Sequence, residues 1–304
     1  MIPHHIRTIL LSIGLYLFTP TAYCKSIALS FDDGVNPAFN TQAEQINNSI
    51  LKHLHDKKIK SIVFPSLVKI GDYQGKHLIQ DWGKSGHLIG NHSALHQNLN
   101  KENITAQDYI QSIEQADTVL KTLPNYVRIY RYPFLKEGNT SVKRDTVYQW
   151  LKLHQYSIGG VSIDASDWLY NRKYLDYIKQ QDQEKLQRLQ QAYINHLLKR
   201  ADYYDQLALI TLKRSPQHLL LLHVNAINAA FLDNVITAFQ QHGWTFIAAE
   251  QALQDPIYAQ RSQNIPAGES VIWSIAKTQG ITELRYPAED APYEIDNLKQ
   301  HGLQ

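Results

Sequence analysis

Short apolar runs alternate with amphipathic stretches along most of the chain. Seven runs are almost continuously hydrophobic, which is typical of parallel strands that are covered on both faces. These runs are Ile27–Phe31, Ile62–Phe64, His87–Ile89, Val127–Tyr130, Tyr156–Ile163, Leu219–Leu222 and Thr245–Ala249. Two stretches between them have apolar residues at helical spacing. The helical positions are Tyr109, Ile113, Ala116, Leu120 and Leu123, and then Leu232, Val235, Ile236 and Phe239.

Strands that alternate with helices predict an α/β fold with a parallel sheet. We expect a distorted or incomplete (β/α) barrel of seven to eight strands. A doubly wound open sheet is the structural alternative. It has no support from a glycine-rich phosphate loop, because none follows the first apolar run.

Residues 171–214 interrupt this alternation between the fifth and sixth runs, and they predict a long amphipathic helix or a helical hairpin. The stripe that indicates it is Leu186, Leu189, Tyr193, Leu197, Ala201, Tyr204 and Ala208. We favour a helix packed on the barrel wall, and a cap or a dimer surface is the alternative. The barrel domain is expected over residues 25–254. Residues 255–304 contain Pro266, Pro287 and Pro292, and we expect them to be loops that wrap around the barrel.

The first 24 residues are typical of a secretory signal peptide. The apolar stretch Ile9–Phe18 is short for a membrane span, and Ala22 and Cys24 supply small residues for cleavage after Cys24. Cleavage after Ala22, acylation of Cys24 and an uncleaved anchor are the alternatives. We therefore expect an exported protein, periplasmic or secreted, with no stable transmembrane anchor after cleavage.

The composition limits the classes of partner. The chain has 304 residues, 43% of them hydrophobic, which is enough for a large core. Its net charge of +2 and the lack of a basic tract argue against a nucleic-acid partner. Cys24 is the single cysteine, so a protein cleaved after it has no disulfide. Nothing in the sequence indicates an oligomeric state.

Two motifs that follow apolar runs supply metal-ligand chemistry. Asp32 and Asp33 come directly after the first run, where residues of a parallel barrel face the active site. One of two adjacent carboxylates can bind a metal while the other takes a proton. His92 and His96 are four residues apart, a spacing that places both rings on one side of a helical turn. With Asp33 as the third ligand, an open fourth position suits catalytic zinc, and iron or another divalent metal is also compatible.

Three later motifs supply groups that orient, protonate or enclose a substrate. Arg131 ends the fourth run and can hold Asp32 in a two-pronged hydrogen bond, while the adjacent proline stiffens a loop whose backbone N–H can meet an oxyanion. His223 ends the sixth run, and a partner carboxylate would keep it protonated and oriented. Asp167 is the natural partner and Asp164 is its rival. The residues that can wall a small apolar pocket are Trp168 and Leu221.

Taken in order, the five motifs resemble those of the polysaccharide deacetylases, carbohydrate esterase family 4. The motifs are Ser30-Phe31-Asp32-Asp33-Gly34, His92-Ser93-Ala94-Leu95-His96, Arg131-Tyr132-Pro133-Phe134, Asp164-Ala165-Ser166-Asp167-Trp168 and Leu221-Leu222-His223. The resemblance extends from about residue 25 to about residue 250. It implies a distorted (β/α) barrel and a divalent metal, usually zinc, with cobalt, nickel, manganese or iron as alternatives.

The resemblance also assigns roles to single residues. It implies that Asp33, His92 and His96 bind the metal, that Asp32 is the catalytic base and that His223 is the general acid. Arg131 then positions the base, Asp167 tunes the acid, and Trp168 and Leu221 hold the acetyl methyl group. The backbone N–H of Tyr132 is expected to stabilise the oxyanion. One departure is Val224-Asn225, where many members carry an acidic residue.

The expected reaction is metal-dependent hydrolysis of N-acetyl groups in a cell-wall or extracellular polysaccharide, which gives acetate and a free amine. An amidase or esterase that acts on a small non-sugar or O-acetylated substrate is one alternative. A non-catalytic glycan-binding protein is the other, although no ligand or base is missing from the motifs.

Overall fold

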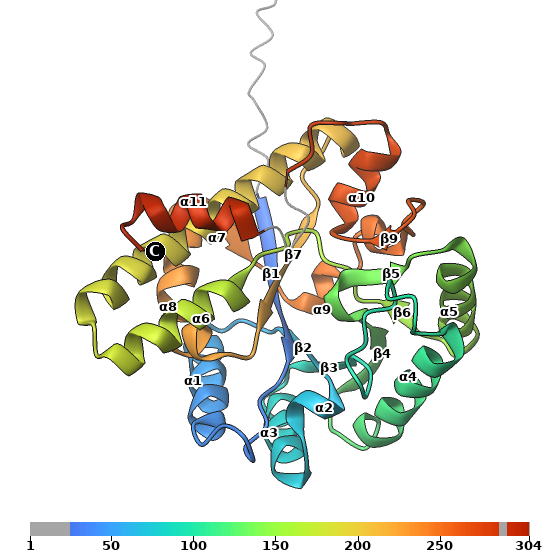
Figure 1. The fold of residues 1–304 in the computed structure, drawn as a ribbon, viewed down its shortest axis with the longest axis horizontal. Helices are drawn as coiled ribbons and strands as arrows, with labels where there is room; N and C mark the ends of the chain where they lie inside the picture. Colours follow the sequence, from blue (N-terminus) through green and yellow to red (C-terminus); the bar gives the residue numbers. More distant parts are fainter. Residues whose placement is uncertain (1–24, 286–290, 304) are drawn as a thin grey trace, which may run out of the picture.

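A computed structural model describes residues 25–285 and 291–303 of the chain (Figure 1). The expected signal segment, residues 1–24, lies outside the described residues. Within them, no helix combines the length and the apolar character that crossing a bilayer requires.

The centre of the fold is a parallel sheet of seven strands, and each strand corresponds to one of the apolar runs. In spatial order six of them are β6 (Ser157–Ile158), β4 (Tyr126–Tyr130), β3 (Leu88–Asn91), β2 (Ile62–Pro65), β1 (Lys25–Asp33) and β7 (Gln217–His223). The seventh, β8 (Trp244–Phe246), pairs with the first residues of β1. The seven predicted strands are therefore confirmed.

The segment that follows β6 closes this sheet into a distorted barrel. At its start the Gly159 N–H donates to the Tyr130 carbonyl of β4 at 2.7 Å, and at its end the Ser162 N–H donates to the Leu219 carbonyl of β7 at 3.2 Å. Ile163 then forms a parallel bridge with Leu220. The two edges of the sheet are thus joined, and the prediction of a distorted barrel is confirmed against the open-sheet alternative.

Helices cover the outside of the barrel. They are α1 (Ala43–Asp56), α2 (Leu67–Ile70), α3 (Tyr73–Lys84), α4 (Ala106–Leu120), α5 (Ser141–Leu153), α8 (Ala226–Gln241) and α9 (Ala249–Ala252). The two predicted apolar stripes fall in or at the end of α4 and α8, and all their residues are buried. Amphipathic helices outside the barrel and side chains packed inside it explain why the strands have apolar residues at most positions.

The stretch predicted to be helical between the fifth and sixth runs forms two helices, α6 (Asp167–Gln180) and α7 (Gln183–Leu212). Every residue of the predicted α7 stripe is buried inside the chain. Figure 1 shows α7 beside α6 and α8, with α11 lying across it. The stripe is therefore packed against the rest of this chain, as the favoured interpretation requires.

The C-terminal part of the chain corrects a prediction, because it contains regular elements where loops were expected. These are a 3-10 turn, η2 (Pro256–Ala259), the short strand β9 (Ala267–Gly268), and two helices, α10 (Val271–Thr278) and α11 (Ala291–Gln300). β9 pairs with β5 (Lys136–Gly138) in a separate two-stranded sheet. The prolines misled the prediction: Pro292 is the second residue of α11, where a missing N–H costs nothing.

A buried ion network holds α11 on α7. The Glu294 carboxylate of α11 pairs with Arg200 and lies 2.9 Å from the Nδ1 of His196, and all three side chains are at most 5% exposed. Burial alone would raise the pKa of Glu294, but His196 and Arg200 lower it to about 2. This pair therefore contributes stability that is present above the ordinary pKa of 4.5 and is lost as the pH falls towards 2.

We expect Glu294→Ala to lower the free energy of unfolding by about 3–5 kcal/mol, because it removes the carboxylate that pairs with the buried Arg200 guanidinium. Urea unfolding at neutral pH measures the change. Glu184→Ala is the matched control, since Glu184 forms an exposed pair with Arg188 on α7 itself and should cost less than about 1 kcal/mol. Equal losses in the two variants would contradict a stabilising role for the buried network.

Candidate active site and metal centre

The predicted motif residues converge because the carboxyl ends of the parallel strands meet at one edge of the barrel. β1 ends at Asp33, β3 ends one residue before His92, β4 ends one residue before Arg131, and β7 ends at His223. A pocket of about 550 Å³ opens there. Its lining is Asp32, Asp33, Lys69, His92, His96, Asn98, Lys101, Phe134, Leu135, Asp164, Ala165, Trp168, Leu221 and His223.

Asp33, His92 and His96 form a compact set of candidate metal ligands. One ligand atom from each lies within 4.8 Å of the other two. The Oδ1 of Asp33 is 3.0 Å from the Nε2 of His96 and 3.9 Å from the Nε2 of His92, and the two imidazole centroids are 5.0 Å apart. These distances allow three atoms to meet around one cation.

The histidines reach this arrangement from a loop, which corrects the expected helical turn. Residues 92–98 have no helical assignment, and Ser93 and His96 have positive φ angles of 65° and 49°. Side chains stabilise the loop: Asn91 Oδ1 accepts the Ser93 N–H at 2.8 Å, and Ser93 Oγ accepts the His96 N–H at 3.1 Å. The loop brings the rings together without the periodicity of a helix.

His92 is prepared to act as a neutral ligand. Its Nδ1 lies 2.8 Å from the Arg131 carbonyl oxygen, so this nitrogen carries the proton and donates it, and Nε2 faces the carboxylates with a free lone pair. Burial is the main reason that the pKa of His92 falls to about 4, and the nearby His96 adds to this effect. A metal ligand must be deprotonated at neutral pH, and His92 meets this requirement.

The Asp33 carboxylate has one oxygen paired and one oxygen available. Its Oδ2 accepts from the Lys69 ammonium at 3.0 Å, whereas its buried Oδ1 forms no hydrogen bond of normal geometry with any described residue. Burial raises its pKa, but His96, His223 and Lys69 together hold the pKa of Asp33 well below its usual range. An ionised carboxylate oxygen beside two imidazole nitrogens is a donor set that suits a divalent transition metal, so these residues fit such a cation.

Arg131 holds the neighbouring carboxylate, Asp32, inside the barrel. Its Nη1 donates to Asp32 Oδ1 at 2.7 Å and to Ser30 Oγ at 2.8 Å, and its Nε donates to the Gly159 carbonyl at 2.7 Å. The expected two-pronged bond to Asp32 is wrong, because only Nη1 reaches that carboxylate and Nη2 has no hydrogen-bond partner among the described residues. The predicted pairing of Arg131 with Asp32 is nevertheless present.

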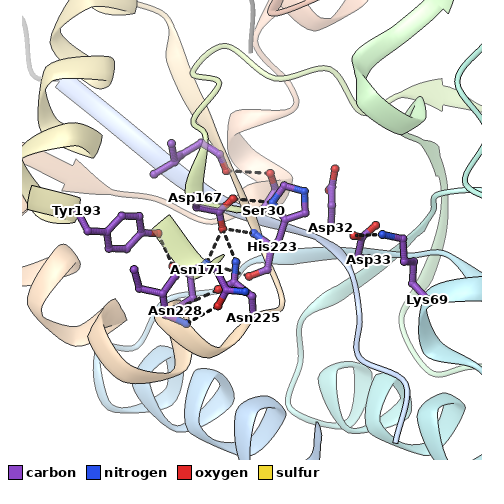
Figure 2. A network of polar contacts seen from close by, with 12 residues as sticks. Ser30, Asp32, Asp33, Lys69, Asp167, Asn171, Tyr193, His223, Asn225 and Asn228 are labelled. Atoms are coloured by element: carbon purple, nitrogen blue, oxygen red, sulfur yellow. Dashed lines mark hydrogen bonds and ion pairs between the residues drawn. The ribbon is translucent and has the colours of Figure 1, made fainter. Parts of the chain in front are cut away.

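His223 is paired with Asp167 and not with Asp164 (Figure 2). The Nδ1 of His223 lies 2.6 Å from Asp167 Oδ1, and the His223 N–H donates to Asp167 Oδ2 at 2.8 Å. The amide groups of Asn225 and Asn228 donate to the same Oδ2 at 2.9 and 2.8 Å. Burial lowers the pKa of His223, but Asp167, with Asp33 and Asp32, raises it to about 10.

Two of the three residues expected to contact the substrate line the pocket. Trp168 and Leu221 line the pocket as expected, but Tyr132 does not. The Tyr132 ring is buried against Tyr109 and Tyr130 in a separate apolar cluster. Phe134 lines the pocket instead, with a positive φ of 59° and its ring edge-on to His96 at 4.6 Å.

Comparison with known proteins shows similarity to one family in the first half of the chain. The sequence profile of the polysaccharide deacetylase family matches residues 20–151. This part of the chain, which includes the first three motifs, is therefore similar to that family. A curated relative, the peptidoglycan-N-acetylglucosamine deacetylase of Bacillus cereus, is 26% identical over 156 residues, which is 50% of each chain. The match thus spans about half the length of that relative.

Solved structures of carbohydrate esterase family 4 share the fold of this domain. PdaA of Bacillus subtilis has a TM-score of 0.51 at 21% identity over 75% of this chain and 80% of that chain. A Streptococcus mutans esterase of the family has a TM-score of 0.51 at 18% identity, over 74% and 86%. A mutant of a family pseudoenzyme with restored enzymatic activity has a TM-score of 0.52 at 18% identity, over 76% and 68%.

Several residues of this candidate site could not be found from the sequence. Lys69 reaches Asp33 from α2, and its position in an ordinary apolar helix gives no signal in the sequence. Asn225 caps α8, which its place before an apolar helical run indicates, but the same side chain also donates to Asp167. Asn228 connects Asp167 to the Tyr193 hydroxyl of α7, a contact between residues 35 positions apart in sequence. These contacts depend on tertiary packing.

We expect His96→Ala to weaken binding of a divalent cation by at least about 10²-fold, because one of three protein ligands is lost. Metal content after dialysis against a weak chelator measures this. His242→Ala is the control, since His242 is exposed at the end of α8 and should leave metal content unchanged. A fully metallated His96→Ala protein would remove this residue from the ligand set.

Proposed function

We propose that the protein is a metal-dependent deacetylase that hydrolyses N-acetyl groups of a cell-wall or extracellular polysaccharide. The observation that carries this proposal is the placement of three components around one pocket: the Asp33, His92 and His96 ligand set, the Asp32 carboxylate, and the protonated His223. A base and an acid on one candidate cation site are the groups that amide hydrolysis requires.

Two further observations support an acetylated amino sugar as substrate. The pocket volume of about 550 Å³ is large enough for a sugar residue with its acetamido group, and Trp168 and Leu221 offer an apolar wall for the methyl. The Bacillus cereus relative is named for the deacetylation of N-acetylglucosamine in peptidoglycan. A polymer of this kind lies outside the cell membrane, which agrees with the proposed export of the protein.

In the proposed mechanism Asp33, His92 and His96 would hold a divalent cation, most commonly zinc in such sites, which would supply polarisation of the acetyl carbonyl and a water of lowered pKa. Asp32 takes the proton of the attacking water, and Arg131 holds this carboxylate in place. His223 donates a proton to the leaving nitrogen, with Asp167 fixing the orientation of its ring. Because Phe134 and not Tyr132 lines the pocket, we assign the oxyanion contact to the Phe134 N–H in place of the Tyr132 N–H.

The experiment that tests the function is acetate release from peptidoglycan, chitooligosaccharide and poly-N-acetylglucosamine, with and without a chelator. We expect release from at least one glycan, its loss with chelator and its recovery when metal is restored. Asp32→Asn should lower kcat by ~10²–10⁴ and keep its metal, because it removes a positioned base and leaves the ligands intact. Chelator-resistant release, or near wild-type turnover by Asp32→Asn, would contradict the proposed mechanism.

The same assay predicts a pH effect at the general acid. His223 must be protonated to act, and its raised pKa of about 10 keeps it protonated through neutral and mildly alkaline pH. Asp167→Asn removes the largest contribution that raises this pKa, so the alkaline limb of the kcat profile should move to lower pH by at least about one unit. An alkaline limb at the wild-type position would show that His223 is not the group that titrates.

A further inference from the structure

Asp164 is a buried carboxylate in the pocket wall to which the proposed mechanism assigns no role. It follows the segment that closes the barrel, so it lies at the same edge as the ends of β1 and β7. Its exposed fraction is 2%. Its neighbours in the pocket lining include Ala165, Trp168, Leu221 and His223.

The Asp164 carboxylate lacks the protein partners that the other buried carboxylates of the site have. Its Oδ2 has no hydrogen-bond partner among the described residues. By contrast, Asp32 receives a hydrogen bond from Arg131, Asp33 receives one from Lys69, and Asp167 receives four from His223, Asn225 and Asn228. Asp164 is therefore a carboxylate of the pocket lining with one buried oxygen to which no described residue donates a hydrogen bond.

Burial without a donor is unfavourable for a carboxylate, so it points to a role in binding. Nearby positive charges offset only part of the unfavourable effect of burial on the ionised form of Asp164. Burial raises the pKa of Asp164 to about 7, although Arg200, Lys136 and His223 act to lower it. Whether protonated or ionised, the carboxyl keeps a lone pair that can accept a hydrogen bond.

The position of Asp164 indicates which part of a substrate it meets. His223 is the proposed donor to the leaving nitrogen, and it lines the pocket together with Asp164 and acts on its charge. An acetylated amino sugar carries N–H and O–H donors on this leaving-group side, whereas a simple aryl ester carries none.

We propose that Asp164 accepts a hydrogen bond from an N–H or O–H donor on the leaving-group side of the substrate and thereby selects acetylated amino sugars over esters without such a donor. This inference rests on the proposed deacetylase function. A site built to pair with a substrate donor discriminates strongly against an analogue that lacks it, because the buried acceptor is then left unpaired.

The test compares Asp164→Leu, which removes the acceptor at similar size, with Asp164→Asn, which keeps one acceptor oxygen. Two substrates are used: the glycan that the wild-type protein deacetylates best, and 4-nitrophenyl acetate, whose leaving group has no donor. We expect Asp164→Leu to lower kcat/KM for the glycan by about 10–100-fold, mainly through KM. Hydrolysis of 4-nitrophenyl acetate should stay within about twofold, and Asp164→Asn should recover part of the glycan activity.

Equal losses on both substrates, or no loss on either, would overturn the inference. If the wild-type protein does not hydrolyse the ester, the glycan data decide alone: a rise in KM supports the contact, and a fall in kcat at constant KM overturns it. If the wild-type protein releases acetate from no glycan, the proposed function fails and this inference fails with it.

Thermal unfolding separates a binding role from a structural one. Replacing an unpartnered buried carboxylate with an apolar side chain should leave Tm unchanged or raise it. The matched control is Asp205→Leu, because Asp205 is equally buried, with 1% exposed, but accepts from Ser215 at 2.6 Å and pairs with His218 at 3.2 Å. This control should lower Tm by at least about 5 °C. A comparable fall in Asp164→Leu would assign Asp164 to the fold and not to the substrate.

Discussion

The buried guanidinium of Arg131 is the interaction on which the arrangement of the site depends. It donates to Asp32 and Ser30 of β1 and to the carbonyl of Gly159 in the segment that closes the barrel, and its own backbone carbonyl accepts from His92. One side chain thus links the end of β4 to β1 and to the closing segment. An arginine in this position needs its acceptors, because an unpaired buried charge is strongly destabilising. The fold and the proposed base are therefore coupled through one ion pair.

The local electrostatic environment gives the two histidines His92 and His223 different protonation states. His92 is buried without a carboxylate in hydrogen-bonding contact and stays neutral, whereas His223 is bonded to Asp167 and stays protonated. A neutral imidazole can bind a cation and a protonated one can act as an acid, so environment alone assigns two histidines to two tasks. The carboxylates differ in the same way, according to whether a guanidinium, an ammonium or several amide groups donate to them.

Helices α7 and α11, which lie outside the regular alternation of strands and helices, are also connected to the site by hydrogen bonds and ion pairs. Tyr193 of α7 donates to Asn228, which donates in turn to Asp167, and α11 is held on α7 by the network around Glu294. Substitutions in these helices are therefore expected to change the orientation of His223, because a short chain of hydrogen bonds connects them to its partner Asp167. The C-terminal helices stabilise the support of the proposed general acid, although none of their described residues lines the pocket.

The sequence by itself determined the strands, the barrel and most of the pocket, because buried parallel strands leave continuous apolar runs and their carboxyl ends meet at one edge. It did not determine how His92 and His96 converge, because a loop with positive φ angles leaves no periodic pattern of apolar residues in the sequence. The oxyanion contact expected at the Tyr132 N–H stays a prediction, and only the tertiary structure shows that Phe134 lines the pocket while the Tyr132 ring packs in a separate cluster. The choice of Asp167 over Asp164 and the contacts of Lys69, Asn228 and Tyr193 were decided by tertiary structure, because they join residues whose separation in sequence carries no information about distance.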